Sequence, residues 1–115
     1  MRVLVCGGRD YNDAQKVYEV LCSLSPSTII HGHAAGADDL ADSWAKANHV
    51  RVMPFSADWG VFGKSAGPIR NKQMLEEGKP DIVVAFPGGK GTANMVKLAR
   101  EAGIPVHEVN QNTSL

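Results

Sequence analysis

Five short apolar runs alternate with segments of helical spacing, and this alternation restricts the fold more than any other feature of the sequence. The runs occupy residues 3–6, 27–31, 50–55, 81–86 and 105–109. The first, second and fourth are almost unbroken, which is typical of parallel strands covered on both faces. Right-handed crossovers between such strands predict an α/β fold, a three-layer, doubly wound parallel sheet of five strands. The predicted strand order is 3-2-1-4-5.

Four helices are predicted between the runs. The first has apolar residues at the spacing i, i+3, i+4, i+7, and Asn12 with Gln15 resembles a capping box at its start. The second begins near residue 37 with the same spacing. The third is expected over about 65–77, with Gly78 as its stop, and the fourth over about 91–102, with Gly103 as its stop.

The size and composition of the chain exclude several classes of protein. Its 115 residues are the usual size of one domain, so a single domain over 1–115 is expected. The formal net charge of zero argues against binding to a long phosphate backbone, but not against a ligand with one or two phosphates. Cys6 and Cys22 lie in apolar runs and are interpreted as small core residues of a reducing compartment. No signal peptide or membrane span is evident, so we expect a cytoplasmic protein without a membrane partner, and a frayed polar tail at 110–115.

Two glycine-rich loops follow the first and fourth runs, which are neighbours in the predicted sheet. Ligands of doubly wound folds bind where the winding direction reverses, which here is between these two strands. The loop PGGKGT would bring backbone N–H groups close to an anion at a helix N-terminus, with Lys90 and Thr92 adding a charge and a hydroxyl. A tight strand-to-helix turn would also require glycines. The loop GGRD would admit a phosphate or ribose beside Arg9, or is a turn with a surface arginine.

Two further segments supply candidate contacts. In HGHAAGADD, Asp38 would either contact a ribose hydroxyl or serve a helix N-terminus. The two histidines of this segment have no third ligand at a suitable spacing, so no metal is expected. Residues 57–74 are interpreted as a long loop that leads into the third helix, where Trp59 would stack on a base or fill the core. Arg70 and Asn71 would close over ribose or phosphate.

Four stretches, VLVCGGRDYND, HGHAAGADDLADSWA, ADWGVFGKSAGPIRNKQM and AFPGGKGTANM, together resemble the SLOG superfamily, and within it the small YspA-like (cpYpsA-related) group. The resemblance covers nearly the whole chain. It implies a Rossmann-like fold and a nucleotide-derived ligand, and relatives in the superfamily suggest a homodimer.

More distantly, the chain is similar to the lonely-guy (LOG) phosphoribohydrolases, which release the base and ribose 5-phosphate from nucleoside 5′-monophosphates. Residues 87–92 match their PGGxGTxxE motif, and Arg70 with Met74 looks like their upstream element. Met95 stands at the position of the catalytic glutamate, and a thioether cannot do acid–base or cation-stabilising work. We name Asp38 as a candidate for the missing carboxylate, but we assign no catalytic residue.

The chain also resembles the DNA-processing protein A family, which binds single-stranded DNA through a GxARGxD element, but Ala35 replaces the arginine. The prediction is therefore a sensor or sequestering protein for a small nucleotide. The alternatives are a LOG-like N-glycosidic hydrolase and, less favoured, a module for single-stranded DNA. No obligatory cofactor is expected. The predicted ligand-binding residues are Gly7, Gly8, Arg9, Gly32, Gly36, Asp38, Trp59, Lys64, Arg70, Asn71, Pro87, Gly88, Gly89, Lys90, Gly91, Thr92 and Asn94.

Overall fold

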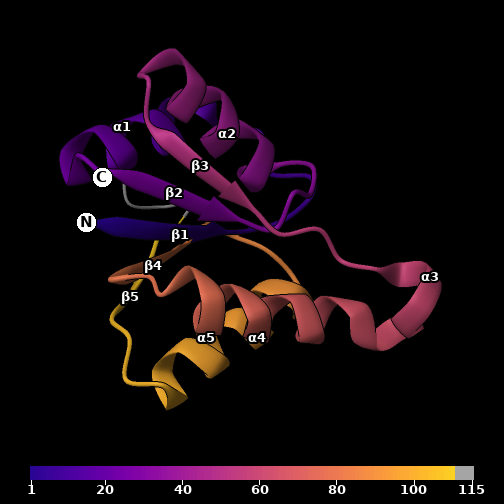
Figure 1. Ribbon diagram of the computed structural model, residues 1–115. Coiled ribbons are helices and arrows are strands. Elements are labelled where there is room, and N and C mark those ends of the chain that lie inside the picture. The colour runs from indigo at the N-terminus through magenta and orange to yellow at the C-terminus, as the bar shows by residue number, and fades with distance from the viewer. Residues whose placement is uncertain (111–115) are drawn as a thin grey trace.

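The computed structural model describes residues 1–110, which form a parallel sheet with helices between its strands (Figure 1). The strands are β1 (Arg2–Cys6), β2 (Thr28–His31), β3 (Arg51–Pro54), β4 (Ile82–Ala85) and β5 (Val106–Glu108). The helices are α1 (Ala14–Leu24), α2 (Ala37–Ala47), α3 (Trp59–Phe62), α4 (Ala66–Gly78) and α5 (Lys90–Glu101), with the 3-10 turn η1 (Gly63–Ser65) before α4. The order β3-β2-β1-β4-β5 confirms the prediction.

Helices cover both faces of the sheet, which confirms the three layers. Side chains alternate across β1, so Val3 and Val5 pack in one core with α1 and α2, whereas Leu4 and Cys6 pack in the other with α4 and α5. Figure 1 shows these two helix pairs on opposite sides of the sheet. Burial on both faces explains why the sequence of the central strands is apolar without alternation.

The first helix begins one residue later than its capping pattern indicates. Asn12 lies in a turn, where its carbonyl accepts the N–H of Ala14 at 3.0 Å. Asp13 is the N-cap, and its Oδ1 accepts the N–H of Lys16 at 3.0 Å. The predicted capping box of Asn12 and Gln15 is therefore wrong, because the sequence holds two adjacent residues of good capping type and the turn selects the second.

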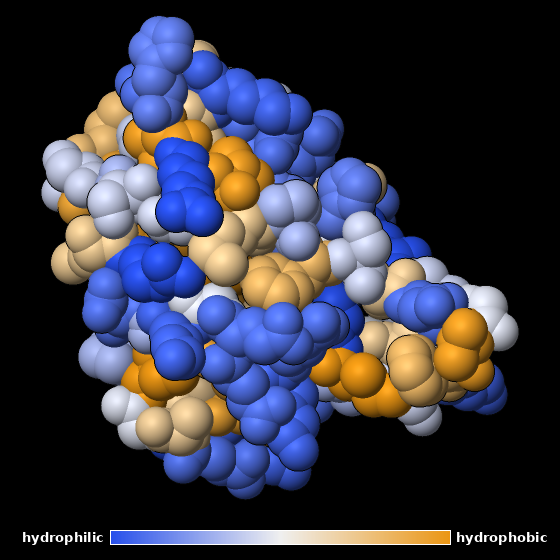
Figure 2. All heavy atoms as spheres, in the orientation of Figure 1, coloured by the Kyte–Doolittle hydropathy of each residue, from blue (hydrophilic) through white to orange (hydrophobic). Residues whose placement is uncertain are grey.

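The segment 57–74 is not the long loop that the sequence suggested. It contains α3 and η1, and then α4 begins at Ala66. Asp58 starts α3, where its Oδ1 accepts the N–H of Val61 at 3.1 Å. The short helix projects from the body of the protein in Figure 1, and Figure 2 shows apolar surface there. The exposed apolar residues of this region are Trp59, Val61, Phe62 and Ile69.

Two smaller expectations are also corrected. Cys22 is exposed on α1 rather than in the core, and its Sγ accepts the indole N–H of Trp44 at 3.3 Å. Gly78 is the last residue of α4, and the left-handed C-cap is Lys79, with φ of 50°. A Cβ on Gly78 would lie 3.1 Å from the Ile30 side chain, so α4 packs tightly against β2 at this residue.

Two further observations concern the C-terminal residues and the length of the helices. Most of the predicted frayed tail, at 111–115, lies outside the described residues. Within 1–110, no helix is long and apolar enough to cross a membrane.

Candidate functional site

Three loops meet at the carboxyl ends of β1, β2 and β4, where the winding of the sheet reverses. Because β1 and β4 pair directly, the loops that follow them lie side by side. The N–H of Gly8 donates to the carbonyl of Pro87 at 2.9 Å, and the N–H of Ala37, at the start of α2, donates to the carbonyl of Gly8 at 3.3 Å. The loop after β1 is therefore held between the other two.

Several positions at this junction require glycine, because the backbones of the three loops approach one another closely. Gly36 has a φ of +75°, and a Cβ there would clash with the carbonyl of Gly8. A Cβ on Gly88 would lie 2.6 Å from the N atom of Gly8 and would clash with Thr92 Oγ1. A Cβ on Gly7 would lie 2.6 Å from that of Ala37. These glycines are required by the fold itself.

Gly89 and Gly91 are different, because packing does not require them to be glycines. A Cβ on either residue would meet no described atom within 4 Å. Gly89 has a φ of −98° and a ψ of −140°, so its φ is not in the left-handed region. Gly89 is the N-cap of α5 and makes no side-chain capping bond, so no capping side chain satisfies the first N–H groups of the helix. The loop thus contains glycines that hold the fold and glycines that keep a space free.

A cavity of about 610 Å³ opens beside these two glycines and is here called the switch-point cavity. Its volume lies in the range of small-molecule sites, roughly 300–1,000 Å³. The predicted residues that line it are Gly7, Gly8, Arg9, Asp38, Trp59, Lys64, Arg70, Asn71, Gly89, Lys90, Gly91, Thr92 and Asn94.

Four predicted residues do not line this cavity. Gly32 lines an adjoining cavity, Pro87 and Gly88 line the far side of their loop, and Gly36 serves the loop crossing. Six lining residues were missed, namely Val5, Cys6, Ala34, Gly67, Pro68 and Met74. Val5 and Cys6 end β1 directly before Gly7, and their position at the strand end was the signal that could have identified them.

The switch-point cavity carries an excess of positive charge. Among its described lining residues, Asp38 is the only acid, against the bases Arg9, Lys64, Arg70 and Lys90. The guanidinium carbon of Arg9 lies 5.7 Å from the ring centroid of Trp59, a cation–π arrangement at the cavity mouth. This balance favours an anionic ligand.

Arg70 and Asn71 connect α4 to the other loops. Arg70 is half-buried, and its Nη1 donates to the carbonyl of Gly32 at 2.5 Å. Burial lowers the pKa of the Arg70 guanidinium, and Asp38 opposes that effect. Asn71 is buried, and its Nδ2 donates to the carbonyl of Gly91 at 3.2 Å and to Asn94 Oδ1 at 2.9 Å. Asn71 therefore positions the first turn of α5.

Asp38 is buried and holds the loop after β2. Its Oδ2 accepts the N–H groups of Gly32, at 2.9 Å, and Ala34, at 3.3 Å. Burial raises the pKa of Asp38, although nearby His31 and Arg70 and these backbone hydrogen bonds act in the opposite direction. The carboxyl group thus has a structural task whether or not it also meets a ligand.

The raised pKa of Asp38 predicts a specific pH dependence of stability. The folded state holds the proton more tightly, so this contribution to stability is full below the unfolded pKa, about 3.9, and is lost as the pH rises through the folded value. Asp38→Asn keeps an acceptor oxygen and removes the titration, so its free energy of unfolding should fall less between about pH 4 and pH 7. Urea unfolding of both proteins measures this, with the exposed neighbour Asp39→Asn as control. Identical pH profiles for the parent and Asp38→Asn would contradict the assignment.

The histidines and cysteines of the region do not form a reactive set. His31 Nδ1 accepts the N–H of His33 at 2.9 Å, so its Nε2 carries the proton and donates to Asp42 Oδ1 at 2.9 Å. No group of three His, Cys, Asp or Glu residues that could hold a metal ion occurs in the part of the chain that the structure describes. Burial raises the pKa of Cys6 to about 12, so its thiol is not ionised at neutral pH.

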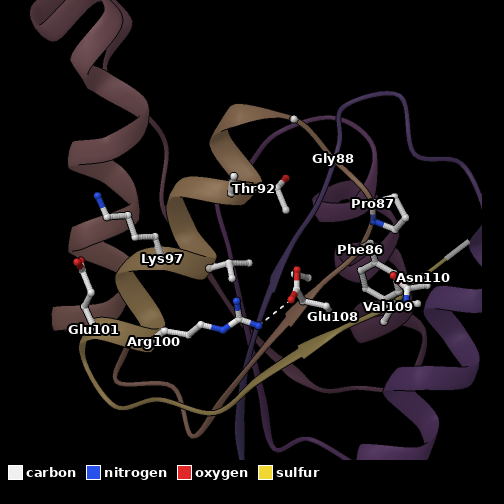
Figure 3. A pocket seen from close by; sticks show the side chains of 14 residues that line it. Phe86, Pro87, Gly88, Thr92, Lys97, Arg100, Glu101, Glu108, Val109 and Asn110 are labelled. Carbon is white, nitrogen blue, oxygen red and sulfur yellow. Dashed lines mark hydrogen bonds and ion pairs between the residues drawn. The ribbon is translucent and has the colours of Figure 1, made fainter.

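A larger cavity, of about 1,030 Å³, lies between α5 and β5 (Figure 3). Its charges are balanced, with Lys97 and Arg100 against Glu101 and Glu108. Arg100 and Glu108 form an ion pair at 2.7 Å, which the dashed line in Figure 3 marks. Because its charges are balanced and it lies beside the edge strand, it is a weaker candidate site than the smaller switch-point cavity.

Comparisons with known proteins agree with this fold. The Gene 61 protein of Mycobacterium phage D29 is 40% identical over 117 residues, which cover 91% of this chain and 93% of the phage protein. DNA processing protein A from Streptococcus pneumoniae superposes with a TM-score of 0.81 at 20% identity over 98% of this chain, which spans 51% of that protein. MurG from Acinetobacter baumannii superposes with a TM-score of 0.55 at 18% identity, over 93% of this chain and 34% of MurG. Residues 1–62 match the family described as YspA, cpYpsA-related SLOG (YAcAr). The chain therefore belongs to the YspA, cpYpsA-related SLOG family.

Proposed function

We propose that the switch-point cavity binds a small nucleotide, with its phosphate against the N-terminal turn of α5. The observation that carries this proposal is the open space at Gly89 and Gly91, where a Cβ would meet no described atom within 4 Å. Backbone N–H groups at a helix N-terminus bind phosphate well, and a Cβ would displace it. Membership of the SLOG family supports a nucleotide-related ligand.

The rest of the cavity suits a nucleoside. Trp59 and Arg9 provide a stacked surface for a base, and Arg70 provides a guanidinium for the phosphate or ribose. Micromolar affinity requires about 8 kcal/mol. A helix terminus contributes at most about 2 kcal/mol, so the three loops must bind the ligand together.

Binding without turnover is favoured over hydrolysis. Met95, at the position of the LOG glutamate, is fully buried in the core that includes Leu4, Ile30 and Met74, so it does not face the ligand. Asp38 is the acid of the switch-point cavity, and its Oδ2 holds the loop after β2. A sensor or sequestering protein therefore fits this site better than an N-glycosidic hydrolase.

The absence of turnover is a prediction for the unmutated protein with AMP, CMP, GMP and UMP. We expect no release of free base, followed by chromatography, because Met95 replaces the LOG glutamate and Asp38 Oδ2 already holds two backbone N–H groups. Robust turnover that survives Met95→Ala but is lost in Asp38→Asn would assign the chemistry to Asp38 and overturn the binding proposal. Met95→Ala also controls for damage to the core.

Binding itself is tested by thermal-shift measurements against these four nucleotides and their nucleosides, followed by calorimetry. We expect at least one nucleotide to stabilise the protein more than its nucleoside does, because the phosphate is bound. A single-stranded oligonucleotide that binds with a steep salt dependence, while no mononucleotide binds, would favour the module for DNA instead.

Arg70 should contribute directly to this affinity. We expect Arg70→Ala to weaken nucleotide binding by about 1.5–3 kcal/mol, the scale of a hydrogen bond to a charged group. Arg70→Lys should recover part of the loss, because lysine has no planar fork. Calorimetry measures both, with Arg100→Ala, an exposed arginine beside β5, as the matched control. If both Arg70 variants bind the nucleotide with the affinity of the parent protein, Arg70 does not contact the ligand and serves only its hydrogen bond to Gly32.

A further inference from the structure

A second cavity, of about 390 Å³, adjoins the switch-point cavity at the carboxyl ends of β2 and β3. The two cavities share Arg9, Ala34, Trp59 and Arg70. The other residues that line the second cavity follow β2 and β3 in the chain, namely Gly32, His33, Ala35, Ser56 and Ala57. The two cavities are therefore compartments of one recess, and Arg9 and Arg70 line both compartments.

The second cavity is cationic and lacks an acid. Its described lining includes Arg9, Arg70 and His33 and no carboxylate. Arg70 uses Nη1 and Nε in hydrogen bonds to Gly32 and Asn71, which leaves Nη2 without a described partner. Ser56 adds a hydroxyl group. This composition differs from the balanced charges beside β5 and is suited to a phosphoryl group.

His33 is held in an unusual backbone conformation in this cavity. Its φ is 54°, in the left-handed region that few non-glycine residues adopt. Its N–H donates to His31 Nδ1 at 2.9 Å, and its own Nδ1 is 2.8 Å from Ser56 Oγ. Its Nε2 has no described partner and remains available to a ligand. Backbone strain of this kind often accompanies binding sites.

We propose that this second cavity, here called the cationic subsite, binds a second phosphoryl group of the nucleotide whose first phosphate lies at Gly89–Gly91. This inference rests on the proposed function. Because β1 separates β2 from β4, and neighbouring strands lie about 4.8 Å apart, the two anion positions are separated by more than one strand spacing. Adjacent phosphates of a 5′-diphosphate are too close together to reach both positions. The ligand class is therefore a nucleoside that carries one phosphate at its 5′ position and another at its 2′ or 3′ position.

The test compares mono- and bisphosphates by calorimetry at constant ionic strength. The probes are AMP, GMP, CMP and UMP, each with its 3′,5′- and 2′,5′-bisphosphate. We expect one bisphosphate to bind about tenfold more tightly than its 5′-monophosphate, or better. The ratio of these two affinities should fall towards one in His33→Ala and in Ser56→Ala. His49→Ala is the matched control, since His49 is also exposed, has a φ of 56° and lies at the opposite end of β3.

The outcomes separate this inference from the proposed function. Equal affinity for mono- and bisphosphates would overturn the cationic subsite and leave the proposed function standing. A bisphosphate preference that survives both substitutions would place the second phosphate elsewhere and would also overturn the subsite. If none of the probes binds, the proposed function fails and the subsite fails with it. The ratio of the bisphosphate and monophosphate affinities should keep its parent value in His49→Ala, which would show that the loss in the other two variants is specific to the subsite.

Discussion

Gly89→Val is expected to abolish nucleotide binding while the protein stays folded. A Cβ at this position meets no described atom within 4 Å and the φ of Gly89 is negative, so the β-branched side chain of valine should extend into the open space assigned to phosphate. Valine is a poorer N-cap than glycine, which costs about 1 kcal/mol of stability. Circular dichroism and urea unfolding establish the fold, and calorimetry with the mononucleotide that binds the parent protein measures the affinity.

Gly91→Ala separates binding from stability, because its two effects have opposite signs. Gly91 lies in the first turn of α5, where alanine should stabilise the helix by up to about 1 kcal/mol. The added methyl group lies beside the predicted phosphate, so the affinity should fall. A folded Gly89→Val protein with parent affinity, together with unchanged binding in Gly91→Ala, would show that this space does not hold the ligand.

Gly36→Ala is expected to cause a large loss of stability. Its φ is +75°, and its Cβ would clash with the carbonyl of Gly8 and lie 2.7 Å from the carbonyl carbon of Arg9. The left-handed conformation costs about 1–2 kcal/mol for alanine, and overpacking adds about 1–3 kcal/mol. Urea unfolding should therefore give a decrease of about 2–5 kcal/mol in the free energy of unfolding.

Gly103→Ala is a close control, because Gly103 has a φ of +76° with no described atom within 4 Å of its Cβ position. It should show the conformational cost without the clash, about 1–2 kcal/mol. We expect a larger loss in Gly36→Ala than in Gly103→Ala, because only the Cβ at residue 36 also meets the loop after β1. Equal losses of stability in Gly36→Ala and Gly103→Ala would mean that the loop after β1 gives way easily, and the junction would then be too soft to position a ligand.

The sheet could be predicted from the sequence because β1, β2 and β4 are buried on both faces and their apolar runs are nearly unbroken. The helix α3 could not, because it is four residues long, has no buried residue, contains Gly60 and is followed by Gly63. A helix without a buried face leaves no periodic signal.

The site was predictable as a set of loops but not in the role of each residue. Gly88 and Gly89 are adjacent in sequence. A Cβ on Gly88 would collide with Gly8, which is far away in the chain, whereas a Cβ on Gly89 would meet no described atom within 4 Å. Asp38 was assigned to a ribose hydroxyl or the helix start, whereas its Oδ2 holds the N–H groups of Gly32 and Ala34. Such roles depend on which loops the topology brings together, and local sequence does not contain that information.

The most direct test of the account is an amide NMR titration of the unmutated protein with the nucleoside 5′-monophosphate that binds best among AMP, GMP, CMP and UMP, in parallel with its nucleoside. Phosphate hydrogen-bonded to the first turn of α5 should shift the amide resonances of Gly89, Lys90 and Gly91 strongly, and the nucleoside should not. Equal shifts of these amides by nucleotide and nucleoside, or nucleotide shifts confined to the cavity beside β5, would contradict the central claim.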